Sequence, residues 1–258
     1  MPEGDTIHQA AARIGAVLTG RMPETIETPH PRHGGDRWPQ RLAGRTVGSV
    51  DAHGKHLFVR FDGQLTLHSH LRMTGAWSVQ RAGERWRRAR RRAWLVMRCE
   101  GWEVVQFDGP VLELMPDSRT RSDPRLASLG QDILGESFHW ERFVRRLRAE
   151  DHTRSIGDAL LDQRTIAGIG NLWKSEACFA AGVDPWRALA DVGDEEVSAI
   201  VTFARERMRR SVQEGYRARP RAVYNRAGQQ CPRCGAIIRS AGQGENNRTT
   251  YWCAGCQR

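Results

Sequence analysis

Four of the six cysteines in this 258-residue chain stand in two Cys-x-x-Cys pairs near its end. The pairs are separated by 18 residues (235–252), a spacing typical of a four-thiolate zinc site. The alternative is two redox motifs that share the chain by chance. We predict one structural Zn²⁺, with a hairpin between the two pairs. The predicted ligands are Cys231, Cys234, Cys253 and Cys256.

The second chemical feature is Pro2, which becomes the terminal amine once the initiator Met1 is removed. A free α-amine has an ordinary pKa of about 7.7–8.0, so a useful fraction is neutral and nucleophilic near pH 7. When a secondary amine attacks a sugar C1′, it forms an iminium that acts as an electron sink. Glu3 lies beside it as a candidate general acid or base. Pro-Glu after Met is common, so this pair needs support from other motifs.

Two further features are suited to phosphate. In Ile166-Ala-Gly-Ile-Gly-Asn171, the glycines let the backbone approach a ligand and the following helix N-terminus favours an anion. A plain helix–turn–helix corner is the alternative. Arg248 lies between the two cysteine pairs, and a guanidinium on a rigid hairpin is also suited to phosphate. The alternative there is a zinc ribbon with a purely structural role.

The overall charge favours a polyanionic partner. Forty Lys and Arg against 30 Asp and Glu leave a net charge of +10, which points to nucleic acid before membrane. No apolar run approaches 18 residues, and the N-terminus has no apolar segment of a signal peptide. The Arg81–Arg92 stretch holds seven arginines. It is interpreted as a solvated loop or strand edge, with a DNA-facing patch as the alternative.

The elements that must position these residues follow from hydrophobic periodicity. A helix is expected over Asp5–Leu18 with Asp5 as N-cap. Short strands between residues 46 and 115 predict a β-sandwich or barrel. Beyond Ser122 the helical period takes over, with Ser137 and Ser155 as expected N-caps and a longer helix from Asp194. The expected strands are His56–Phe61, Gln64–His68, Ala93–Met97 and Val104–Phe107.

Five motifs in a fixed order carry a resemblance to a known family. They are Met1-Pro-Glu-Gly-Asp-Thr, Gly54-Lys-His-Leu-Phe58, Ser69-His-Leu-Arg-Met-Thr-Gly75, the segment Leu161–Leu172, and the four-cysteine end. Together they resemble the formamidopyrimidine-DNA glycosylase / endonuclease VIII family over residues 1–256. The resemblance implies an α+β fold with DNA in a cleft between two lobes. Its expected parts are a two-sheet β-sandwich with a leading helix (1–121), a helix–two-turn–helix DNA-binding domain (122–221) and a zinc finger (222–258).

The resemblance also implies a role for each motif residue. Pro2 would attack C1′ and form the Schiff base, and Glu3 would protonate the opened sugar. Lys55 would bind phosphate and assist β-elimination, while Asn171 would hold phosphate at the helical turn. Arg248 would hold the phosphates flanking the lesion and assist δ-elimination.

Two residues are expected to enter or face the DNA directly. Met73 falls where the family inserts an apolar wedge into the base stack, which offsets part of the cost of flipping a base out. A core methionine is the alternative for Met73. Arg72 beside it would face DNA.

The expected activity is that of a bifunctional DNA glycosylase and abasic-site lyase acting by β,δ-elimination. Its partner would be double-stranded DNA with an oxidised base or abasic site, with no membrane and no diffusible cofactor. A cytoplasmic, nucleoid-associated, bacterial-type monomer is expected. The rivals are a non-catalytic damaged-DNA-binding protein on the same scaffold and a zinc-ribbon module of another pathway.

The substrate expectation rests on two departures from the formamidopyrimidine branch. That branch usually carries Asp-Pro-Arg-Arg-Phe-Gly, whose arginine faces the orphan base, where this chain has Gln106-Phe-Asp-Gly-Pro-Val111. The segment Gly215–Gln230 also looks too short for that branch's loop over an oxidised purine. Both favour the endonuclease VIII branch and oxidised pyrimidines, with an oxidised-purine-specific glycosylase as the alternative.

Overall fold

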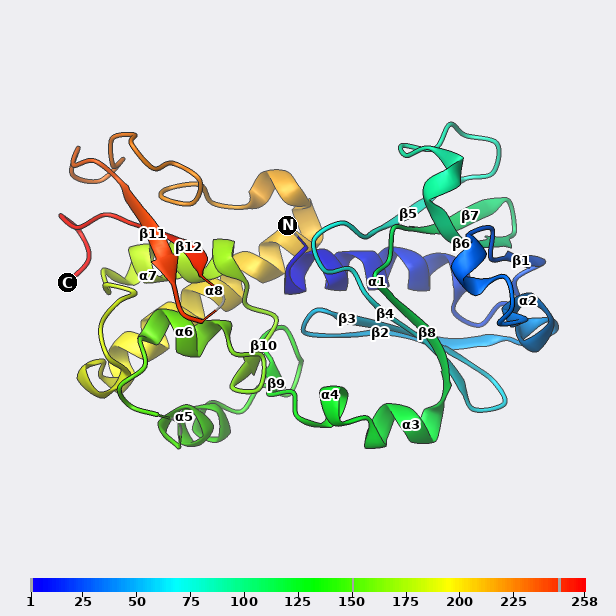
Figure 1. Ribbon diagram of the computed structural model, residues 1–258, viewed down its shortest axis with the longest axis horizontal. Coiled ribbons are helices and arrows are strands. Elements are labelled where there is room, and N and C mark those ends of the chain that lie inside the picture. Colours follow the sequence, from blue (N-terminus) through cyan, green and yellow to red (C-terminus); the bar gives the residue numbers. More distant parts are fainter. Residues whose placement is uncertain (1, 150, 246) are drawn as a thin grey trace. The chain divides into compact units, whose positions relative to one another are not determined.

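Helix α1 (Gly4–Leu18) opens the computed structural model, which describes residues 2–149, 151–245 and 247–258 (Figure 1). The removal of Met1 concerns a residue outside this range. The chain divides into two units: Pro2 with Thr6–Ala127, and Glu3–Asp5 with Ser128–Arg258. The predicted helix is confirmed, but Asp5 lies inside its first turn and is not its N-cap.

Two four-stranded antiparallel sheets form the first unit and confirm the predicted sandwich. One buried cluster contains residues of both sheets and of α1, including Ile14, Leu57 and Met97. The first sheet has the order β1 (Thr25–Glu27), β6 (Ala93–Cys99), β7 (Trp102–Phe107), β5 (Ala76–Arg81). The second has the order β2 (Val47–His53), β3 (His56–Phe61), β4 (Leu65–His70), β8 (Val111–Pro116). Short helices α2 (Trp38–Leu42), α3 (Asp117–Ser122) and α4 (Pro124–Ala127) complete the unit.

A row of histidines occupies the face of β3 and β4 that points away from this core. His56 Nδ1 lies 2.9 Å from His68 Nε2, and His68 Nδ1 lies 3.4 Å from the Glu113 carboxylate. Burial, and then the neighbouring His70 and His68, lower the pKa of His56 to about 2. Burial and then Arg72 lower the pKa of His70 to about 4. The folded sheet therefore holds these rings neutral at pH values where an unfolded chain would protonate them.

We expect the free energy of unfolding to fall as pH drops below about 6.5, because the unfolded state then binds more protons than the folded state. His56 adds a slope of up to about 1.4 kcal/mol per pH unit between its unfolded and folded pKa values. Urea unfolding between pH 7.5 and 4.5 should show a shallower loss for His56→Gln than for the unsubstituted protein. The exposed His139→Gln is the control. Equal slopes for both variants would contradict a role of His56 in this dependence.

Helices and a C-terminal hairpin form the second unit. Its core contains Phe143, Trp173 and Ile200. Ser155 caps α6 as predicted, since its side chain accepts a hydrogen bond from Asp158 N. The prediction for Ser137 is wrong, because the next helix begins after His139. The helices are α5 (Trp140–Arg148), α6 (Ile156–Leu161), α7 (Asn171–Ala181) and α8 (Asp194–Glu214). The strands are β9 (Gln131–Asp132), β10 (Ile166–Ala167), β11 (Arg239–Gln243) and β12 (Arg248–Trp252).

The hairpin β11–β12 belongs to the helical unit because β12 packs on α7. A small cluster containing Phe179, Val223 and Cys253 joins the cysteine module to that helix. The boundaries predicted near residues 121 and 221 stay predictions. Among the described residues, no helix is both long and apolar enough to cross a membrane.

Candidate active site and zinc site

Glu3 is fixed at the N-terminus of α7. Its carboxylate accepts hydrogen bonds from Leu172 N at 2.9 Å and Trp173 N at 3.3 Å, and the residue is 1% exposed. The first N–H groups of a helix lack partners within the helix, and the dipole there favours negative charge. The helix therefore holds Glu3 as an anion in one orientation, immediately after Pro2 in the chain.

Two glycines, Gly4 in α1 and Gly170 directly before α7, leave room for the close packing around Glu3. Gly4 N donates to Gly168 O at 2.9 Å, and a Cβ on Gly4 would lie 2.9 Å from Gly168 Cα. A Cβ on Gly170 would lie 2.3 Å from the Glu3 carboxylate carbon. The sequence pattern predicts a phosphate cradle, whereas the anion found at this helix N-terminus is the Glu3 carboxylate. Larger residues at Gly4 or Gly170 would displace it.

A buried ion pair locks the start of α1 in the same unit. Asp5 accepts hydrogen bonds from Arg219 at 2.7 and 2.8 Å, from Ser211 Oγ at 2.5 Å and from Trp173 Nε1 at 3.1 Å. Asp5 and Arg219 are both buried. The network fixes Asp5, two residues after Glu3, and removing one partner of the pair would leave an uncompensated buried charge.

The first residues of α7 also hold the hairpin. Asn171 Nδ2 donates to Thr249 O at 2.6 Å. One turn later, the buried Lys174 Nζ donates to Thr250 Oγ1 at 2.5 Å and to Gln243 Oε1 at 3.1 Å. Burial lowers the pKa of Lys174 to about 8. Lys174 was not predicted as part of the site, and the only sequence signal for it is its position three residues after Asn171 on one helix face.

The four predicted cysteines come together. Their Sγ atoms lie within 4.8 Å of one another, with 3.8 Å between Cys231 and Cys256 and 3.5 Å between Cys234 and Cys253. Thiolates at about 2.3 Å from a tetrahedral zinc lie about 3.8 Å apart, so these separations fit one Zn²⁺. None of the four is in a disulfide. The group is a structural zinc site that anchors the base of the hairpin.

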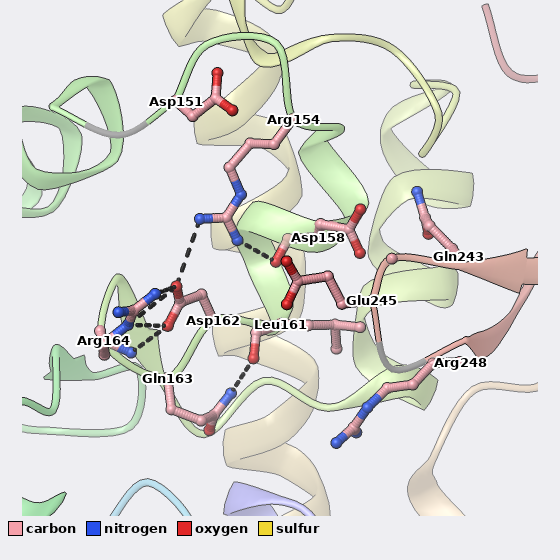
Figure 2. A pocket seen from close by; sticks show the side chains of 11 residues that line it. Asp151, Arg154, Asp158, Leu161, Asp162, Gln163, Arg164, Gln243, Glu245 and Arg248 are labelled. Carbon is pink, nitrogen blue, oxygen red and sulfur yellow. Dashed lines mark hydrogen bonds and ion pairs between the residues drawn. The ribbon is translucent and has the colours of Figure 1, made fainter.

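A pocket of about 650 Å³ opens beside the hairpin turn, within the second unit (Figure 2). Two of its guanidiniums are paired, because Arg164 lies 2.7 Å and Arg154 lies 3.4 Å from Asp162. Arg248 is exposed, and its side chain has no hydrogen bond or ion pair within the described ranges 2–149, 151–245 and 247–258. Its guanidinium is available to an anion from outside the protein.

The remaining predicted residues lie in the first unit. Lys55 follows Gly54 in the two-residue turn between β2 and β3, close enough to His70 to contribute to lowering that ring's pKa. Arg72 and Met73 lie in the loop between β4 and β5. Met73 is 65% exposed, which rules out the alternative of a core methionine. Arg72 adopts φ 47°, and its N–H donates to His70 Nδ1 at 3.1 Å, so the loop is held in a tight turn.

Comparison with known proteins decides the family. Residues 1–110 match the formamidopyrimidine-DNA glycosylase N-terminal domain, and residues 129–219 match the formamidopyrimidine-DNA glycosylase H2TH domain. The chain is 40% identical to the probable endonuclease 8 2 of Streptomyces coelicolor, over all of this chain and 94% of that protein. This chain belongs to the formamidopyrimidine-DNA glycosylase / endonuclease VIII family. It is a DNA glycosylase and abasic-site lyase of base excision repair.

Other members of the family support the same placement. The chain is 35% identical to the DNA-(apurinic or apyrimidinic site) lyase Nei2 of Mycolicibacterium smegmatis, over all of this chain and 99% of that protein. The likeness to proteins named endonuclease 8 2 favours the endonuclease VIII branch. The fold matches Lactococcus lactis formamidopyrimidine-DNA glycosylase bound to DNA with an abasic site, with a TM-score of 0.83 at 22% identity and full coverage of both chains.

Proposed function

We propose that this enzyme removes oxidised pyrimidines from double-stranded DNA, using Pro2 as nucleophile, and then cuts the strand by β,δ-elimination. The observation that carries the proposal is the Glu3 carboxylate, held by the N-terminus of α7 one residue after Pro2. A carboxylate in fixed geometry next to a terminal amine is suited to moving protons for a Schiff-base reaction. We also propose that the enzyme acts as a monomer in the cytoplasm, at the nucleoid of a bacterial-type cell.

In the proposed chemistry, the Pro2 nitrogen attacks C1′ as the C1′–N bond to the base breaks, and the departing base takes a proton from water. The Glu3 carboxylate takes the proton that the Pro2 nitrogen loses and then gives it to the ring oxygen as the sugar opens, which leaves an iminium on Pro2. Loss of a C2′ proton then expels the 3′ phosphate, and a second elimination expels the 5′ phosphate. Lys55, Asn171 and Arg248 hold phosphates during these steps, and zinc places the hairpin that carries Arg248.

The preference for pyrimidines rests on the branch. The relatives named endonuclease 8 2 are 37–40% identical, against 32% for a formamidopyrimidine-DNA glycosylase of Roseiflexus. The turn at Gln106–Val111 also lacks the two arginines of the formamidopyrimidine motif. The runner-up is an oxidised-purine glycosylase, which the Roseiflexus relative favours.

Single-turnover assays on matched duplexes test this preference. Release of thymine glycol or 5-hydroxycytosine is expected to be at least ten times faster than release of 8-oxoguanine opposite cytosine. The same protein should cut an abasic duplex, which controls for active enzyme. Faster release of 8-oxoguanine would favour the alternative of an oxidised-purine glycosylase. Tight binding of every duplex with no cutting would select the non-catalytic binder.

A further inference from the structure

The arginine loop, residues 82–92 between β5 and β6, is anchored at its centre by an aromatic side chain. Trp86 is half-buried, and its Nε1 donates to Glu103 Oε2 at 2.7 Å. Its ring meets Phe107 edge-on, with 5.6 Å between the ring centres. Arg90 lies over the Trp86 ring at 4.7 Å. The loop is therefore fixed to the sheet and is more than a solvated connection.

Two of its arginines tie the loop to neighbouring turns. Arg88 Nη1 donates at 2.7 Å both to Thr74 O and to the Asp108 carboxylate, and Arg92 Nε donates to the same carboxylate at 2.9 Å. Although burial opposes it, these hydrogen bonds lower the pKa of Asp108, so its carboxylate is ionised at neutral pH. We call this group of Arg88, Arg92 and Asp108 the clamp. Thr74 directly follows Met73, so the clamp joins the arginine loop to the loop that presents the exposed methionine.

The clamp leaves other arginines facing solvent. Arg87 and Arg91 each adjoin a clamped arginine, so their backbone is fixed, and both are exposed. Their side chains have no hydrogen bond or ion pair among residues 2–149, 151–245 and 247–258. Exposed guanidiniums of this kind are suited to pair with the phosphates of an outside polyanion. A single apolar tip, Met73, flanked by guanidiniums fits a duplex with a flipped base better than a lipid surface, which would need a broader apolar face.

We propose that the arginine loop is a phosphate-binding surface beside the Met73 loop, with Arg87 and Arg91 contacting the backbone of duplex DNA and Arg88 and Arg92 holding them in place. The inference rests on the proposed binding of double-stranded DNA. Contacts of this kind add affinity without regard to base sequence or lesion. They also add to the dependence of affinity on salt, because each neutralised phosphate releases counterions.

The test compares the double variant Arg87→Ala/Arg91→Ala with the unsubstituted enzyme on a duplex containing a non-cleavable abasic analogue. The slope of log K against log salt is expected to become shallower by about 1.8, that is about 0.9 for each lost phosphate contact. Arg41→Ala, which removes an exposed arginine from α2, is the matched control and should leave the slope unchanged. At saturating abasic DNA the double variant should still form the Schiff base at the normal rate.

Two results would overturn the inference. An unchanged slope in the double variant, with the normal enzyme binding and cutting DNA, removes the arginine loop from the interface and leaves the proposed function intact. A reduction in Arg41→Ala of half that in the double variant, since it removes one positive charge and not two, would show a diffuse effect of net charge. Absence of DNA binding by the unsubstituted enzyme would instead defeat the proposed function itself. Equal melting temperatures of the variants exclude unfolding as the cause.

Discussion

Replacing Pro2 by Gly is expected to slow base release at least ~1000-fold, equivalent to about 4 kcal/mol of transition-state free energy. The secondary amine of proline gives an iminium that has no N–H proton to lose, so it stays an electron sink through both eliminations. The primary amine of glycine gives an imine that must be kept protonated. Release should be measured in a single turnover with enzyme in excess over a thymine glycol duplex.

The control for Pro2→Gly is binding. Its Kd for a duplex with a non-cleavable abasic analogue should stay within about threefold of the normal value, since Pro2 acts on the sugar and makes no phosphate contact in the proposed chemistry. Intact mass must show that Met1 is absent from both proteins. Unchanged turnover by a Pro2→Gly protein that has lost Met1 would remove Pro2 from the mechanism.

Replacing Cys253 by Ser is expected to release zinc and to weaken DNA binding about 10- to 100-fold, the effect of losing one charged hydrogen bond. Cys253 is fully buried, and its Sγ lies 3.5 Å from that of Cys234. The zinc site holds the base of the hairpin in which Arg248 is the first residue of β12 and Thr249 O accepts a hydrogen bond from Asn171. Zinc content per chain and DNA affinity at fixed salt are the measurements.

Cys99→Ala is the matched control for zinc release. Cys99 is buried in the first unit, where burial raises the pKa of its thiol, and it lies outside the four-cysteine cluster. This variant should keep one zinc per chain and normal affinity. If Cys253→Ser also kept one zinc per chain, the predicted ligand set would be wrong.

Local patterns in the sequence were enough to predict several elements. The cap at Ser155 depends on residues three apart, and the cysteine spacing depends on two short turns, so both can be recognised without knowing the fold. Strand β3 was predicted with its observed limits because its alternating apolar residues fill one face. The helix after Ser137 begins later than expected because a serine alone does not specify where a helix starts.

Long-range pairing explains what the sequence did not reveal. Asp5 resembles a helix cap, but its carboxylate binds Arg219, 214 residues away. Lys174 looks like an ordinary surface lysine on a helix, but it is buried and donates hydrogen bonds to Gln243 and Thr250 of the hairpin. Gly170 was associated with a ligand, whereas it makes room for Glu3. Each of these depends on a partner that no local pattern identifies.

The most direct test of the central claim is borohydride reduction of the enzyme on a duplex with an abasic site, followed by mass mapping of the cross-linked peptide. The protein must first be shown to begin at Pro2 and to hold zinc. We expect a covalent protein–DNA product with the sugar attached to the nitrogen of Pro2. A product attached to a lysine such as Lys55, or no product from protein that binds the duplex tightly, would contradict the proposed role of Pro2.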